Sequence, residues 1–496
     1  MQIKTTSNEL FSSSKNTILL GFFEGELKLG ISTVPEEFAD SLKDTLKSLN
    51  FTGKTEQQHI LRLNNKVNAI ISGFGPRENF TLNSLRLAVA SAVKSAGKIS
   101  SKELSFSINM GSAVSIFSST DAAKAIAESA VMSVYHFDSS KSEREENLLE
   151  KIFITNIDES DKKEIDNAVS EGIVFGELNV KARELANSTP SLATPDYMAK
   201  KAKKIAEDNN LKIKIITKSE MEKQGMNGIL AVASGSRNEP KFVIMEYDAG
   251  SEKTIVLVGK GVCFDSGGLD IKPAAHMETM KMDKSGAVTV MAVMEAIAKL
   301  KPNVNVVGVM PLVENLISDA SYKPGDIIKT LSGKTIEVLN TDAEGRIILS
   351  DALYYASTTY NPECIIDIAT LTGAVVIALG NNVAGIMGND KALTSKLIVS
   401  GTKTYERLWE LPMFEDYSEL MKSDHADIKN VISNTPGNPA GTITAAVFLS
   451  NFINNSKWAH LDVAGTAWSS EDLGYYSKGS TGFGARLLVQ FLIDYE

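Results

Sequence analysis

The chain has 496 residues, of which 43% are hydrophobic, enough for a sizeable core divided among two or three domains. Its formal net charge is −10, from 61 acidic and 51 basic residues, which argues against a nucleic-acid-binding footprint over the whole surface. Only two cysteines occur, Cys263 and Cys364, so a disulfide framework is excluded and a cytoplasmic location is expected.

The first part of the chain mixes strand-like and helical runs. The apolar run 17–23 is too short to span a membrane and no signal-peptide cleavage pattern follows it, so we expect no membrane segment. Strands are expected at 18–23 and 66–72, and helices at 38–49, 84–95 and 122–134.

A charged, serine-rich stretch at 139–147 reads as a connector. It precedes a helix at 161–184 with acidic residues early and basic residues late. We place a domain boundary near 168, which defines an N-terminal domain of residues 1–168, connector included, and a C-terminal domain of residues 169–496.

The second part alternates strands with helices. Strands are expected at 242–246, 254–259, 305–311, 335–339, 363–369 and 460–464, and helices at 286–300, 347–357 and 442–454. Several of these strands are nearly continuous Val/Ile/Leu runs, as in sheets covered by helices on both faces. The fold class is therefore α/β: a C-terminal domain with a mostly parallel, helix-covered sheet, plus a smaller N-terminal α/β domain.

Polar residues cluster just after the expected strands of the second part. Because ligands bind beyond the carboxyl ends of strands in open α/β sheets, these residues are expected to converge. They include four carboxylates and three cationic side chains: Asp265, Asp283, Asp342, Glu344, Lys260, Lys272 and Arg346. Four carboxylates held close together repel one another unless cations lie between them, and two divalent metals would supply that charge. If 342–344 is extended, Asp342 and Glu344 share one face.

Other interpretations of these residues stay open at this point. None of the five histidines has the spacing of a His-based zinc motif, so a metal site would be carboxylate-rich. The glycines after Asp265 also permit a phosphate-binding loop, although no standard phosphate-loop pattern occurs. Taken singly, Asp265 could be a turn residue, Asp342 and Glu344 could lie at a helix N-terminus, and the cationic residues could be surface charges.

At these residues the sequence resembles the leucyl aminopeptidase family. Its motifs stand in order at 258–261, 264–268, 271–273, 280–283, 340–346, 369–374, 441–446 and 458–465, the most specific being Asn340-Thr341-Asp342-Ala343-Glu344-Gly345-Arg346. These blocks cover roughly residues 180–490. The first 165 or so residues resemble the family's N-terminal domain by position and length.

The resemblance implies a site with two divalent metal ions, zinc or manganese. Lys260, Asp265, Asp283 and Glu344 would hold one ion, and Asp265, Asp342 and Glu344 the other, with a bridging hydroxide that attacks the peptide bond. Lys260 can be a ligand only as the neutral amine.

The resemblance also implies two catalytic residues. Lys272 would stabilise the developing oxyanion, and Arg346 would hold a bicarbonate ion that transfers the proton. A pocket for a Leu- or Met-type side chain would be lined by Met280, Asn340, Thr370, Leu371, Gly373 and Ala464. The implied activity is that of an aminopeptidase acting on peptide substrates, assembled as a homohexamer.

Two alternative functions share the resemblance: a dipeptidase acting on Cys-Gly-type substrates, and a DNA-binding accessory role, for which the acidic chain offers little. The sequence also departs from the family at His276 and Lys284, where many members have a glycine and an uncharged residue. Because Lys284 follows Asp283, we expect it to affect metal affinity or substrate preference. Cys263, His425 and His460 are expected to be structural or supporting residues.

Overall fold

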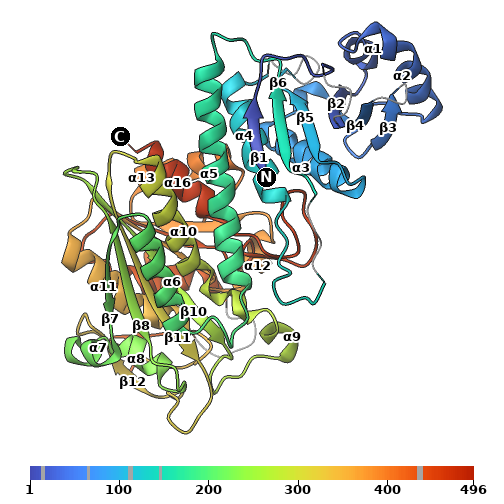
Figure 1. Ribbon diagram of the computed structural model, residues 1–496. Coiled ribbons are helices and arrows are strands. Elements are labelled where there is room, and N and C mark those ends of the chain that lie inside the picture. The colour runs from blue at the N-terminus through green and yellow to red at the C-terminus, as the bar shows by residue number, and fades with distance from the viewer. Residues whose placement is uncertain (13–16, 64–66, 110–115, 144–147, 433–438, 496) are drawn as a thin grey trace. The chain divides into compact units, whose positions relative to one another are not determined.

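The computed structural model describes residues 1–12, 17–63, 67–109, 116–143, 148–432 and 439–495. The chain divides into two compact units (Figure 1). The N-terminal unit comprises Met1–Val180 with Glu471–Ser477, and the C-terminal unit comprises Lys181–Ser470 with Lys478–Glu496. The boundary expected near residue 168 falls inside helix α5, which spans Lys162–Asn187.

The N-terminal unit is built on a six-stranded sheet with strand order β1-β6-β5-β2-β4-β3. All neighbouring strands are parallel except β3 and β4. The strands are β1 (Gln2–Thr5), β2 (Thr17–Phe23), β3 (Gln58–Leu63), β4 (Val67–Gly75), β5 (Glu103–Ser107) and β6 (Lys151–Thr155).

Helices cover both faces of this sheet (Figure 1). Helices α1 (Leu27–Ile31) and α2 (Glu36–Ser48) pack on one core, where Phe38, Leu42 and Leu46 form the apolar stripe of α2. Helices α3 (Leu82–Lys98) and α4 (Ser119–Ser133) pack on the other core. Thr81 and Ser118 accept N-cap hydrogen bonds at the starts of α3 and α4, which fixes where these helices begin.

The C-terminal unit is built on a nine-stranded sheet. Its main path is β16-β15-β18-β14-β9-β11-β8-β7, and β10 pairs with β11. The strands are β7 (Lys212–Ile216), β8 (Lys241–Tyr247), β9 (Thr254–Gly259), β10 (Gly261–Asp265), β11 (Asn305–Asn315), β14 (Cys364–Ala369), β15 (Ala384–Gly388), β16 (Leu408–Glu410) and β18 (Trp458–Asp462).

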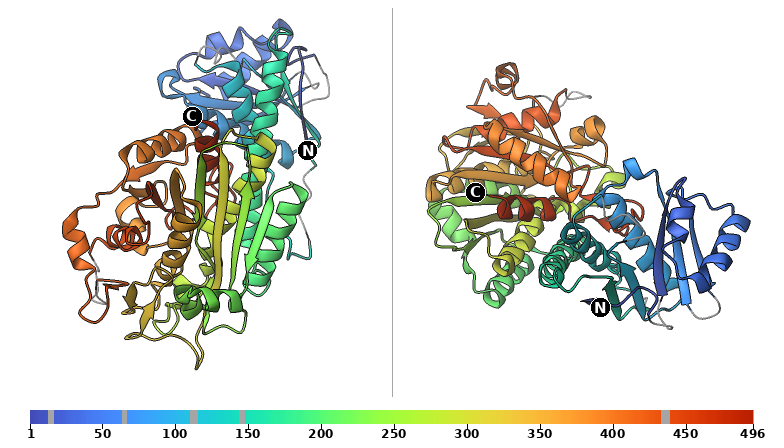
Figure 2. Two further views of the ribbon diagram at one scale, coloured as in Figure 1. Left: turned by 90° about the vertical axis from the view of Figure 1, so that its left-hand side faces the viewer. Right: turned by 90° about the horizontal axis from the view of Figure 1, so that it is seen from above.

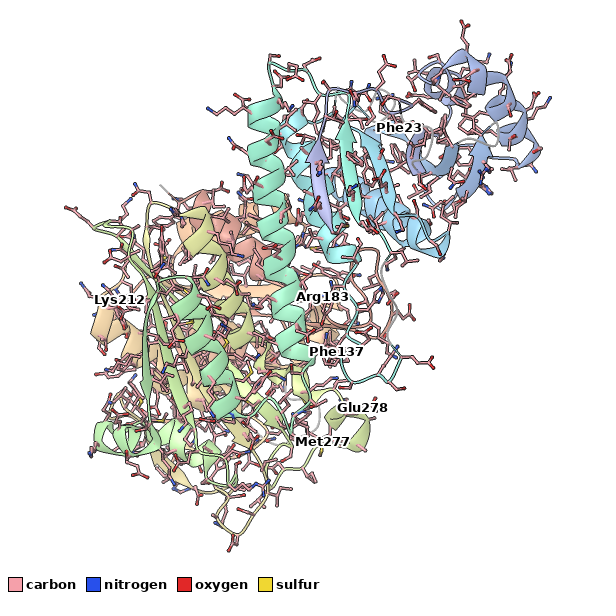
Figure 3. The ribbon with its side chains drawn as sticks, viewed as in Figure 1. Phe23, Phe137, Arg183, Lys212, Met277 and Glu278 are labelled. Atoms are coloured by element: carbon pink, nitrogen blue, oxygen red, sulfur yellow. The ribbon has the colours of Figure 1, made fainter. Side chains whose placement is uncertain are left out.

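The centre of this sheet, β18-β14-β9-β11, is parallel, and antiparallel pairs occur toward its two sides. Lys212 starts edge strand β7 (Figure 3), where a charged side chain discourages pairing with another chain. The predicted fold class, a mostly parallel sheet within an α/β protein, is confirmed.

Helices lie on both faces of the nine-stranded sheet (Figure 2). One layer contains α6 (Pro195–Asp208), α10 (Ser285–Leu300), α13 (Lys391–Thr404) and α16 (Ala485–Ile493). The other contains α8 (Asn227–Ala233), α11 (Glu344–Tyr360) and α15 (Gly441–Ser450), which share one core with the sheet. Shorter helices are α7 (Lys218–Gln224), α9 (Ala274–Met277), η3 (Met280–Lys284), α12 (Gly373–Leu379) and α14 (Glu415–Leu420).

The placement of one expected strand in the main sheet is wrong. The strand expected at 335–339 is β13 (Thr335–Glu337), which belongs to a separate three-stranded sheet with β12 (Ile327–Lys329) and β17 (Ile428–Lys429). The segment 342–344 is not extended, because α11 begins at Glu344, so the condition for a shared strand face does not apply. Among the described residues, no helix is both long and apolar enough to cross a membrane.

Candidate active site

The site begins where Lys260 joins β9 to β10. The Lys260 N–H donates to the Ile368 carbonyl at 3.1 Å, and the Lys260 carbonyl accepts from Ala287 N–H at 2.8 Å. A Cβ on Gly286 would lie 2.1 Å from the Ile368 carbonyl oxygen, and one on Gly259 would lie 2.5 Å from that of Gly286. Glycine at both positions therefore lets the start of α10 approach the sheet, which brings the preceding η3 turn beside Lys260.

Lys260 lies between two carboxylates from different elements. Its Nζ is 2.7 Å from Asp283 Oδ1 in η3 and 2.9 Å from Glu344 Oε1 at the start of α11, and it donates to the Thr370 carbonyl at 2.8 Å. A side chain on Gly345 would meet Lys260, because its Cβ would lie 2.6 Å from Lys260 Cε. Burial opposes the charge on Lys260, but Asp283 and Glu344 outweigh it and raise the pKa of the amine.

Lys272 joins the two remaining carboxylates. Its Nζ lies 2.9 Å from Asp265 Oδ2 and also contacts Asp342 Oδ1. Burial opposes its charge too, but Asp265, Glu344 and Asp342 together raise the pKa of Lys272. Burial, with the nearby Asp265 charge, raises the pKa of Asp342 to about 7. Both lysines are thus ammonium ions that partly neutralise the carboxylates.

The arrangement fits bound cations. Carboxylate oxygens of Asp265, Asp342 and Glu344 lie within 4.8 Å of one another. Asp283 Oδ2 is buried and has no hydrogen-bond partner among the described residues. Four acidic side chains face two ammonium groups in a buried place, where burial raises the pKa of Asp265, Asp283 and Asp342. Their carboxylate oxygens are of the kind that binds Mg²⁺, Mn²⁺ and Zn²⁺.

Asn315, at the end of β11, was not assigned a role from the sequence. Its Nδ2 donates to Asp265 Oδ1 at 2.9 Å and to the Thr341 carbonyl at 3.0 Å. The Tyr322 hydroxyl donates to the same Thr341 carbonyl at 2.7 Å. Asn315 and Tyr322 thus tie the turn carrying Asp342 to the end of β10. The signal in the sequence was a polar residue shortly after the apolar run expected as a strand at 305–311.

Beside the carboxylates lies a cavity of about 610 Å³. Asn340, Asp342, Arg346, Leu371 and Gly373 are among its lining residues, with apolar side chains contributed by α12 and α15. The other residues predicted for the substrate pocket lie outside this lining: Met280 starts η3, Thr370 donates to Asp283 Oδ1 at 2.7 Å, and Ala464 donates its N–H to Asp462.

Arg346 lies in the first turn of α11 and is 6% exposed. Its Nη1 donates to the Asn430 carbonyl at 2.6 Å, whereas its Nε has no hydrogen-bond partner among the described residues. Burial lowers the pKa of Arg346 to about 10, so the guanidinium is charged at neutral pH.

Two buried acids support the walls of the site. Asp462, at the end of β18, accepts from the Leu371 N–H at 3.1 Å and the Thr372 hydroxyl at 2.6 Å. Asp367, in β14, lies 2.6 Å from His460 Nδ1 and accepts from Trp458 Nε1 at 2.6 Å. His460 is therefore buried in the sheet and paired with Asp367.

The two departures from the family motifs differ in their burial. His276 is exposed on α9. Lys284 is buried, and its Nζ donates to backbone carbonyls, including that of Ala186 at 3.1 Å. Cys263 and Cys364 are free, buried thiols, and burial raises the pKa of each to about 12.

Comparison with known families identifies the family of the chain. A model of the cytosol aminopeptidase family, catalytic domain, matches residues 180–489, and a model of the N-terminal domain of the same family matches residues 19–144. The chain belongs to the cytosol aminopeptidase family. The family predicted from the sequence motifs is therefore confirmed, and the chain is a metallo-aminopeptidase, a hydrolase.

Relatives in the cytosol aminopeptidase family match along the whole chain. A probable cytosol aminopeptidase of Geobacter sulfurreducens is 40% identical and covers 93% of this chain and 92% of its own length. One of Roseiflexus castenholzii is 39% identical and covers 100% and 99%. Among solved structures, a mutant of tomato leucine aminopeptidase has a TM-score of 0.87 at 30% identity, covering 99% of this chain and 96% of its own.

A further solved structure is the bottromycin maturation enzyme BotP in complex with Mn. It has a TM-score of 0.84 at 28% identity and covers 97% of this chain and 99% of its own.

Proposed function

We propose that this aminopeptidase removes Leu- or Met-type residues from peptide N-termini with two divalent ions, zinc or manganese. Lys260, Asp265, Asp283 and Glu344 would hold one ion, and Asp265, Asp342 and Glu344 the other. The observation that carries the proposal is the cluster of carboxylate oxygens from Asp265, Asp342 and Glu344 within 4.8 Å. When bound, two such ions polarise the scissile carbonyl and lower the pKa of a water molecule.

Lys260 must lose a proton to act as a ligand. In the chain alone, Asp283 and Glu344 favour its ammonium form. A metal ion competes with that proton, so metal binding should release protons and weaken as the pH falls.

Lys272 is suited to stabilise negative charge on the substrate. Its neighbours Asp265 and Asp342 keep its amine protonated and hold it in place. The side chain is 13% exposed, so a substrate can still reach it. A positive charge held in place before reaction stabilises a developing oxyanion more effectively than a mobile one does.

Arg346 is suited to hold an anion beside the reacting carbonyl. The guanidinium borders the cavity, and its Nε donor has no hydrogen-bond partner among the described residues. Bicarbonate held there, with help from the backbone around Leu371, would accept the proton that a charged arginine cannot accept.

The cavity favours an apolar side chain. Leu371, Ile377, Leu411 and Ile443 contribute to its lining, and its volume of about 610 Å³ accommodates a Leu or Met side chain. Met280, Thr370 and Ala464 are proposed to complete the pocket for the first residue. We further propose a cytoplasmic homohexamer that acts on peptides and does not bind nucleic acid, which the net charge of −10 supports.

The test combines metal analysis with hydrolysis of Leu-p-nitroanilide, before and after chelation and after return of Zn²⁺ or Mn²⁺. We expect two ions per chain, activity lost on chelation and regained on metal return, and slower hydrolysis of Cys-Gly. The variant Asp342→Ala should lose metal and activity, whereas the exposed control Asp319→Ala should keep both. Full activity in Asp342→Ala would contradict the site assignment.

A further inference from the structure

Lys284 is a buried lysine that the proposed reaction does not use. It is 0% exposed and lies at the junction of two elements, as the last residue of η3 and the N-cap of α10. Its Nζ donates to the carbonyls of Ala186 at 3.1 Å and Ser188 at 3.3 Å, and also to the carbonyl of Lys281. All three donors of the ammonium are therefore used by backbone oxygens.

Two of these carbonyls, those of Ala186 and Ser188, lie at the end of helix α5, which ends at Asn187. Arg183, labelled in Figure 3, lies on the last turns of the same helix. The last carbonyls of a helix have no donor within the helix and form the negative end of its dipole. An ammonium group satisfies both needs. The third carbonyl, of Lys281, belongs to the η3 turn itself, so Lys284 binds that turn to the end of α5.

The η3 turn carries Asp283. One oxygen of this carboxylate, Oδ1, is fixed by the Thr370 hydroxyl and Lys260 Nζ, each at 2.7 Å. The other oxygen, Oδ2, is buried and has no hydrogen-bond partner among the described residues. Where Oδ2 points depends on the backbone of the turn, and Lys284 holds that backbone through the Lys281 carbonyl and the end of α5.

We propose that Lys284 is a positioning residue for Asp283, and through it for one of the two metal ions of the proposed function, on which this inference rests. The second ion would use Asp342 instead of Asp283. The turn carrying Asp342 is held by Asn315 and Tyr322, and neither residue provides one of the three acceptors of Lys284. Loss of the lysine should therefore weaken the binding of one ion and leave the binding of the other unchanged.

The test measures stepwise metal affinities of the full chain. Lys284→Met keeps the length of the side chain but removes its donors, and Lys284→Gln restores an uncharged N–H donor. Lys334→Met is the matched control, since Lys334 Nζ also donates to a backbone carbonyl, that of Asn451 at 3.1 Å, but on the surface. Each chain is stripped of metal and titrated with Zn²⁺ against a chromophoric chelator, and the thermal unfolding of the metal-free chain is recorded.

We expect one of the two affinities of Lys284→Met to fall about 10- to 100-fold, the usual effect of removing a group that orients a ligand. The other affinity should stay as in the wild type, Lys284→Gln should recover part of the loss, and Lys334→Met should show none. If Lys284→Met does not fold, Lys284→Gln carries the same comparison.

Two results would overturn the inference. One is unchanged metal affinities in Lys284→Met. The other is an equal loss of affinity for both ions together with a lower melting temperature, which would indicate a general loss of stability. A wild-type chain that binds no pair of ions would instead contradict the proposed function.

Discussion

Asn315 Nδ2 donates a hydrogen bond of 2.9 Å to Asp265 Oδ1. The same nitrogen donates to the carbonyl of Thr341 at 3.0 Å, so one amide connects the strand end carrying Asp265 with the turn carrying Asp342. Neither contact was evident in the sequence, because the three segments are distant along the chain and meet only through β10, β11 and the start of α11.

The first prediction concerns this amide. Replacing Asn315 with Ala leaves Asp265 and the 340–344 turn without their common donor, so metal affinity and kcat should each fall about 10- to 100-fold. The matched control is Asn305→Ala, at the other end of the same strand, where Asn305 Nδ2 donates to the Ser251 carbonyl at 2.6 Å. Metal titration and peptide hydrolysis decide the matter; equal effects of the two variants would argue against a special role for Asn315.

The second prediction separates Arg346 from the metal ligands. Arg346→Ala should bind two ions like the wild type but lower kcat by about 10²- to 10³-fold, the effect of losing one preorganised charge-stabilising group. Added bicarbonate should stimulate the wild type more than the variant. Arg237→Ala, an exposed arginine, serves as the control. Loss of metal from Arg346→Ala would mean that this residue supports the carboxylates instead.

The third prediction concerns pH. Asp351 on α11 is fully buried and accepts N–H groups from Ile229 at 3.1 Å and Leu331 at 2.8 Å, yet burial raises its pKa to about 7. An unfolded chain has a pKa near 3.9 there, so between about pH 4 and pH 7 the folded chain binds more protons and its free energy of unfolding falls as pH rises.

From pH 5 to pH 8 this loss amounts to about 3 kcal/mol, from roughly two pH units at 1.36 kcal/mol each. Asp351→Asn does not titrate, so the metal-free variant should lose about that much less stability than the wild type over this range. Urea unfolding at both pH values measures the difference. Parallel pH profiles for the two chains would show that Asp351 is ionised throughout.

The fourth prediction concerns the buried pair in the central sheet. Asp367 and His460 are 0% exposed, and Asp367 also accepts from Trp458. Removing one partner leaves the other buried without its charge partner, so Asp367→Ala should lower the free energy of unfolding by about 3–5 kcal/mol. Because neither residue contacts the carboxylate cluster, the folded fraction should keep its metal content. Denaturant unfolding tests the loss of stability, and metal analysis tests the retained metal content. A fully stable variant that lacks metal would contradict both expectations.

Much of the fold followed from hydrophobic patterning. The continuous apolar run at 254–259 is β9 as predicted, because a strand buried on both faces leaves no polar alternation. The run at 335–339 alternates instead, with Ile336 and Val338 buried between more exposed residues, and it forms a small half-buried sheet outside the main one. Alternation was the available signal, and reading it would have placed β13 correctly.

The site was less accessible to sequence reasoning. The convergence of charged residues follows from the rule for strand ends, and the structure brings Lys260, Asp283 and Glu344 into contact. Contacts that depend on strand register could not be predicted in this way. Asp367 faces His460 only because β14 and β18 pair in that register, and no local pattern encodes such pairing. The direction taken by Lys284, toward α5 and not the carboxylates, depends instead on how the η3 turn packs against the end of that helix, which no local pattern encodes either.

The two buried thiols have a practical consequence. Cys263 and Cys364 are closed to solvent and, with pKa values of about 12, carry almost no thiolate at neutral pH. The cysteines of the native chain should therefore not react with maleimides. A single cysteine introduced at an exposed position, such as Asp319, would then carry a fluorophore or spin label alone, and the natural cysteines would not first have to be removed.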